Sequence, residues 1–129
     1  MIQLNTRQFR ALRLASLASI VILVVGSRFR AAYEIYAHSS VARTAGITEE
    51  QLAAIVAGRK PAGLSDETET GYDAATALLE GGVLAAPIYE RARGLFGQHG
   101  VNELIYLVGH YCFVSITLNG FDIPVPQAA

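Results

Sequence analysis

Apolar residues recur along the chain mainly at helical spacing, and polar or glycine residues typical of helix ends separate the apolar segments. Thr48 and Gln51 stand three residues apart before an apolar run, which is the pattern of a capping box, and Ser65 precedes an acidic first turn. Gly46 and Gly58 follow two other segments, where a residue with left-handed backbone commonly ends a helix. Strand-like alternation bounded by hairpin turns is almost absent. The pattern therefore predicts an all-α fold.

These signals divide the chain into helical segments. The expected ranges are about 14–27, 27–45, 48–58, 65–80, 87–97 and 101–118. Gly81 and Gly82 should stop the fourth segment, Pro87 fits the first turn of the fifth, and Gly97 should end it. The last segment is so apolar that both of its faces should be covered, so we expect it to be central. Asn119 and Gly120 should cap it.

The first apolar run has two interpretations. The uncharged stretch "LASLASIVILVVGS" follows Arg7, Arg10 and Arg13, as in a secretory signal peptide. It is shorter than the roughly 20 residues that a membrane-spanning helix needs, and a small-x-small cleavage site fits poorly. We therefore expect a buried helix and no membrane association, and a signal or anchor within residues 1–27 stays the alternative.

Length and composition indicate one domain that assembles with further copies. The chain has 129 residues, within the usual range for one domain, and 52% of them are hydrophobic. We expect a single domain over residues 1–129, with a variable N-terminal part at 1–16 and an extended tail at 121–129, where two prolines prevent a helix. The positive mean hydropathy predicts apolar surface that a partner covers, hence a homo-oligomer.

Charge and cysteine content exclude some classes of function. Ten basic and eleven acidic side chains nearly balance, without the basic excess that binding to a nucleic acid backbone needs, so we expect no nucleic acid partner. Cys112 is the single cysteine, so the chain forms no internal disulfide and no structural metal site from thiolates. A lone thiol suits a reducing compartment, and we expect the protein in the cytoplasm.

The order of several short motifs resembles a known family. "YEIYAH" is followed by "ARTAGIT", then by "LSDETE" and finally by "NELIYLVGHY" leading to "SITLNGFDIPVP". In this order and spacing, from about residue 17 to 126, the chain resembles the carboxymuconolactone decarboxylase family. The resemblance implies the helical bundle that the family shares with alkylhydroperoxidase D, and a homo-oligomer, either a trimer or a hexamer.

The chain departs from that family at particular positions. Peroxidase-type members carry a C-x-x-C pair, where this chain has Ala31 and Glu34, and an upstream glutamate, where it has Ser19. Decarboxylase-like members have the glutamate and the histidine at the positions of Glu34 and His38, usually with tryptophan where this chain has Ile35. The resemblance thus favours the decarboxylase branch. A thiol-dependent peroxide reductase is the alternative, although a lone cysteine lacks the resolving partner that this chemistry needs.

Glu34 and His38 are the candidate catalytic residues. Four residues apart on a helix, they lie on one face, so the carboxylate can orient the imidazole and keep a proton available for general acid catalysis. The resemblance implies a small carboxylated unsaturated lactone as substrate, and no cofactor or metal, because the conjugated carbonyl accepts the electrons released with carbon dioxide. Candidate substrate-binding residues are Tyr33, Tyr36, His110 and Tyr111 as donors to oxygen, and Arg43 for a carboxylate.

Structural interpretations of the same residues stay open. A Glu/His pair at this spacing is also an ordinary helix contact worth about 0.2–0.5 kcal/mol. His110 is expected to be a core histidine bonded to a carbonyl, and Tyr106 and Tyr111 to be packing residues. Cys112 is expected to be a small buried hydrophobe. A non-catalytic helical assembly is therefore a further alternative to an enzyme.

Overall fold

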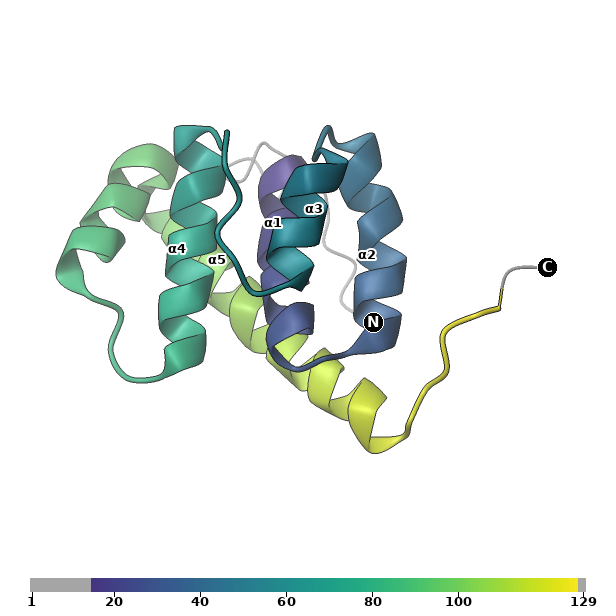
Figure 1. Cartoon of the computed structure of the whole chain (residues 1–129). Coiled ribbons are helices and arrows are strands. Elements are labelled where there is room, and N and C mark those ends of the chain that lie inside the picture. The colour runs from purple at the N-terminus through teal and green to yellow at the C-terminus, as the bar shows by residue number, and fades with distance from the viewer. Residues whose placement is uncertain (1–14, 128–129) are drawn as a thin grey trace.

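The computed structural model describes residues 15–127, which form helices connected by short loops and contain no strand. The helices are α1 (Ala15–Arg28), α2 (Ala32–Thr44), α3 (Glu49–Val56), α4 (Asp66–Glu80) and α5 (Ala86–Gly120). Figure 1 shows α1 between α4 on one side and α2 on the other, with α5 running obliquely past them. The expectation of an all-α fold is confirmed.

Helix α1 is the centre of the bundle. It packs against each of the other four helices, and most of its residues from Leu17 to Gly26 are buried. Gly71 of α4 lies so close to α1 that a Cβ atom there would stand 2.1 Å from Cδ1 of Leu17. The first apolar run is thus a buried helix, as expected, because an all-apolar helix must be enclosed on every side.

The predicted helix ends agree with the structure at several positions. Thr48 and Gln51 form the capping box, in which the Gln51 amide donates to the Thr48 hydroxyl and the Thr48 amide donates to the Gln51 side chain. Ser65 accepts a hydrogen bond from the Thr68 amide at the start of α4. Gly46 and Gly58 follow α2 and α3 with positive φ angles of 95° and 76°.

The predicted continuous helix over 27–45 is wrong at its beginning. Helix α1 ends at Arg28, and α2 starts only at Ala32. The Arg30 amide donates to the Ser27 carbonyl, and the Ala31 amide donates to the Gly26 carbonyl, which is the pattern of a Schellman motif. Arg30 has the left-handed φ of 53° that this motif requires at its C′ position. Sequence reasoning missed this end because glycine, the usual signal, is absent.

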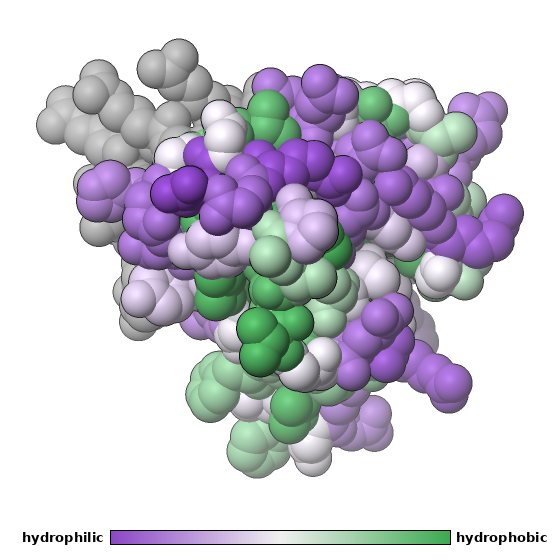
Figure 2. Space-filling view, turned by 90° about the vertical axis from the view of Figure 1, so that its left-hand side faces the viewer, coloured by the Kyte–Doolittle hydropathy of each residue, from purple (hydrophilic) through white to green (hydrophobic). Residues whose placement is uncertain are grey.

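Helix α5 differs from expectation in two respects. The predicted segments 87–97 and 101–118 form one helix with a kink at Gly97, whose φ of 70° and ψ of 174° are not helical. The second segment is also not central, because Tyr106, Phe113 and Ile116 are 73%, 69% and 57% exposed. Figure 2 shows apolar residues reaching the surface below a band of hydrophilic ones, on the side where α4 and the start of α5 lie.

Among the described residues, α5 is the helix with the length and composition to cross a membrane. This is weak evidence, because long apolar helices of water-soluble folds have the same properties.

The end of α5 is tied to the α1–α2 turn. The Asn119 side-chain amide donates a 2.7 Å hydrogen bond to the Phe29 carbonyl, so its role is a tertiary contact and not the predicted local cap. Residues 123–127 continue without regular structure and leave the bundle (Figure 1). The expected variable segment at 1–16 lies almost entirely outside the described residues.

Candidate functional site

Glu34 and His38 contact each other on α2, as their spacing predicts. His38 Nε2 lies 2.9 Å from Glu34 Oε1. The two side chains differ in accessibility, because the Glu34 side chain is 4% exposed and that of His38 is 21% exposed. The carboxylate therefore holds one ring nitrogen inside the bundle, while part of the imidazole stays accessible from outside.

Glu34 is buried where α1 and α2 meet, next to Gly26. A Cβ atom on Gly26 would lie 3.1 Å from Cγ of Glu34, so only glycine leaves the side chain its full space. Glu34 Oε2 is buried and has no hydrogen-bond partner among the described residues. An unpartnered buried polar atom costs about 1–3 kcal/mol of folding free energy, and more when the group is charged. Such a group is expected at a site that binds or reacts, because packing alone does not favour it.

Tyr111 of α5 completes the cluster. Its ring meets the His38 ring edge to face, with the centroids 5.3 Å apart and an interplanar angle of 87°. Burial, and secondarily the negative charge of Glu34, raise the pKa of the Tyr111 phenol. The phenol thus stays protonated at neutral pH and is available as a hydrogen-bond donor. We call Glu34, His38 and Tyr111 the acid–base cluster.

The other predicted site residues lie at varying distances from this cluster. His110 is exposed and contacts the Tyr111 ring edge to face at 5.2 Å, so the expected core histidine is wrong. Tyr33 is partly buried and Tyr36 is half exposed, and their rings contact each other with centroids 6.3 Å apart. Arg43 is exposed and forms an ion pair with Glu49 at the α2–α3 corner. The Glu49 carboxylate raises the pKa of Arg43.

Two buried positions, one packed against Glu34 and one on the same helix as Tyr111, were not singled out from the sequence. Gly26 provides the space for Glu34, and its only sequence signal is a glycine inside an apolar helix, which often marks close packing. Ser115 is fully buried on α5, four residues after Tyr111, and its hydroxyl has no partner among the described residues. A hydroxyl at this helical spacing from a candidate donor was the signal that could have identified it.

The described residues offer neither a reactive thiol nor a group of metal ligands. Burial raises the pKa of the partly buried Cys112 thiol, so little thiolate is present at neutral pH. Within residues 15–127, no group of three or more His, Cys, Asp or Glu side chains is placed to hold a metal ion.

A pocket lies on a different face of α1 from the acid–base cluster. Its lining includes Ser27 and Arg28 of α1, which directly follow the Gly26 that packs against Glu34. Neither Glu34, His38 nor Tyr111 belongs to its lining. The two features are therefore separate candidate sites.

Comparisons of this chain with protein family models, with curated proteins and with solved structures find no match.

Proposed function

We propose that the acid–base cluster serves a cofactor-free carboxy-lyase acting on a small carboxylated unsaturated lactone, as in the carboxymuconolactone decarboxylase family that the chain resembles. The main support is the 2.9 Å contact between His38 Nε2 and the buried Glu34 carboxylate. A carboxylate that fixes one nitrogen of a partly exposed imidazole leaves the other nitrogen, Nδ1, free to exchange a proton with a substrate.

The proposed reaction begins with cleavage of the bond between the lactone carbon and its carboxylate. Carbon dioxide leaves, and the electron pair passes into the conjugated lactone carbonyl to form a dienolate. Hydrogen-bond donors stabilise the negative charge on the dienolate oxygen, a role that we assign to the protonated Tyr111 phenol. His38 then delivers the proton from Nδ1 to carbon and regains it from water. Glu34 acts as a positioning residue that orients the imidazole.

The alternative of a thiol-dependent peroxide reductase has less support. Such an enzyme needs a low-pKa thiolate and a resolving thiol, whereas burial raises the pKa of Cys112 and no second cysteine exists. A non-catalytic helical assembly would leave the buried Glu34 oxygen, which has no partner within residues 15–127, without a role.

The test follows ultraviolet absorbance of a carboxylated muconolactone together with release of carbon dioxide. His38→Ala should lower kcat by about 10²–10⁴, the usual contribution of a general acid. The matched control is His99→Ala, which removes an exposed histidine of α5 and should leave the rate unchanged. Turnover that is equal in wild type and His38→Ala would disprove the assigned mechanism.

We also propose that the protein is a homo-oligomer, a trimer or hexamer by the resemblance, and that the outer face of α5 takes part in the contact. The support is the exposure of Tyr106, Phe113 and Ile116, since apolar side chains in such a row are typical of interfaces. Light scattering should give a lower mass for Phe113→Ser than for Val83→Ser, which changes a 96% exposed residue before α5. Equal masses for the two variants would show that the outer face of α5 takes no part in the contact between subunits.

For the location in the cell we propose the cytoplasm, without attachment to a membrane. The support is the lone cysteine and the burial of the first apolar run within the bundle. Recovery of the protein in the membrane fraction in the absence of detergent would contradict this proposal.

A further inference from the structure

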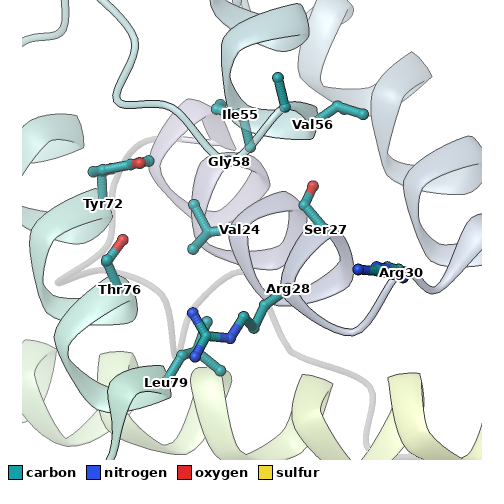
Figure 3. Close-up of a pocket in the computed structure, with 11 residues that line it drawn as sticks. Val24, Ser27, Arg28, Arg30, Ile55, Val56, Gly58, Tyr72, Thr76 and Leu79 are labelled. Atoms are coloured by element: carbon teal, nitrogen blue, oxygen red, sulfur yellow. The ribbon is translucent and has the colours of Figure 1, made fainter.

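The pocket on the other face of α1 has the size of a small-molecule site. Its volume is about 370 Å³, and its lining residues come from α1, α3, α4 and the turns that follow α1 and α3. Ligand sites in proteins usually have volumes of about 300–1,000 Å³. Figure 3 shows the side chains of α1 and α4 on opposite sides of the space, with α3 closing it above.

One part of the pocket is apolar, and another part is cationic and polar. Val24, Ile55 and Leu79 provide aliphatic walls from three helices. Arg28 and Arg30 border the space near the end of α1 (Figure 3). No aspartate or glutamate occurs among the lining residues, and neither arginine forms an ion pair with another described residue. The charge in the pocket is therefore positive and uncompensated by the described lining.

A buried hydrogen-bonding group directly precedes Arg28 in the sequence. The Ser27 hydroxyl is buried and has no hydrogen-bond partner among the described residues. A hydroxyl in this state gains a partner when a ligand brings an oxygen atom to it. Thr76 and Tyr72 of α4 add further hydroxyl groups to the lining.

The backbone of Arg30 gives an independent reason to assign a role to its side chain. Arg30 stands at the left-handed C′ position of the Schellman motif after α1, with a φ of 53°. The same motif after α2 and α3 has Gly46 and Gly58 at this position, and after α5 it has Asp122, a residue type that tolerates the left-handed conformation better than arginine does. A side chain costs stability there, because its Cβ atom crowds the backbone in the left-handed conformation. An arginine in place of glycine is thus unfavourable for the turn itself, and this supports a role for its side chain.

We propose that this pocket binds a small amphipathic carboxylate, with its carboxylate between Arg28 and Arg30 and its hydrocarbon part against Val24, Ile55 and Leu79. Two guanidinium groups and a free hydroxyl match the acceptor oxygens of a carboxylate, and arginine recognises this group through paired hydrogen bonds. The aliphatic walls from three helices favour a hydrocarbon body over a small polar anion. This site is independent of the acid–base cluster and of the reaction proposed for it.

Calorimetric titration with octanoate below its micellar concentration tests the proposal. Octanoate should bind with saturation, whereas acetate, which lacks the hydrocarbon part, and octyltrimethylammonium, which has the opposite charge, should bind at least about tenfold more weakly. Equal binding of octanoate and octyltrimethylammonium, or no saturable binding of octanoate, would overturn the proposal.

Arg30→Gly is the decisive variant, because it should strengthen the fold and weaken the site. Removal of the strained side chain should raise the thermal midpoint, while loss of one guanidinium should weaken octanoate binding about tenfold or more. Arg28→Gln should weaken binding similarly. The matched control, Arg59→Gln, changes an exposed arginine that follows the pocket residue Gly58 but is not in the lining, and it should retain the affinity.

Several outcomes separate the possibilities. An equal loss of affinity in Arg59→Gln would show that binding follows net charge and would overturn the proposed site. Unchanged affinity of Arg30→Gly for octanoate would also overturn the proposed site. His38→Ala should retain octanoate binding, so failure of this proposal and failure of the proposed decarboxylation are distinguishable.

Discussion

Replacement of Glu34 by methionine should stabilise the fold and lower the proposed decarboxylase activity. The Glu34 side chain is 4% exposed, its Oε2 atom has no partner among the described residues, and its Oε1 atom contacts His38. The unpartnered buried oxygen costs about 1–3 kcal/mol. The Glu–His contact, at i, i+4 spacing, contributes only about 0.2–0.5 kcal/mol. Methionine has a similar unbranched shape and fits beside Gly26, so Glu34→Met should gain about 1–2 kcal/mol.

Urea denaturation followed by circular dichroism measures this change. The midpoint should rise in Glu34→Met without a change in slope, since both states expose similar surface on unfolding. The control is Glu50→Met, which alters an exposed glutamate of α3 and should change stability by less than about 0.5 kcal/mol. The proposed decarboxylase activity should be lower in Glu34→Met because the imidazole loses its orienting partner.

A lower stability of Glu34→Met would contradict this prediction. If Glu34→Met were less stable than wild type by more than about 1 kcal/mol, the carboxylate would be a structural anchor, since only removal of a well-paired buried group is that costly. The burial of Glu34 would then be explained by stability and would not indicate a functional role.

Two further predictions concern packing and pH. Gly71→Ala should lower the free energy of unfolding by about 1–3 kcal/mol, because its new methyl group overlaps Leu17. This loss should largely disappear when Leu17 is also changed to alanine. Additive effects of the two substitutions in a double-mutant cycle would contradict the observed contact. Burial alone would raise the pKa of Asp73, but its bonds to Arg91 and Lys60 together lower it. The resulting stabilisation is present above about pH 4, which is the pKa of an aspartate in the unfolded chain, and it is lost as the pH falls through the lower pKa of Asp73 in the folded state. Asp73→Asn should therefore have a lower free energy of unfolding than wild type at pH 7, and acid denaturation should show this difference becoming smaller below about pH 4. A difference that does not change with pH would contradict the stabilising role of the ionised Asp73.

Local sequence signals determined the helices and many of their ends. The capping box of Thr48 and Gln51 and the left-handed glycines 46 and 58 act within a few residues, so the sequence alone specifies them. The Glu34–His38 contact was also predictable, since helical spacing places both side chains on one face.

Which apolar helix is central, and what surrounds the candidate site, depends on how the helices pack. The apolar composition of the segment 101–118 predicted that it is central, yet α1 occupies the centre, because composition does not show which neighbours cover a helix. The contact of Tyr111 with His38 joins α5 to α2 across a long stretch of sequence. The pocket with Arg28 and Arg30 likewise depends on how α3 and α4 pack against α1. Periodicity specifies which residues share a face of one helix, but the packing of helices specifies which faces meet.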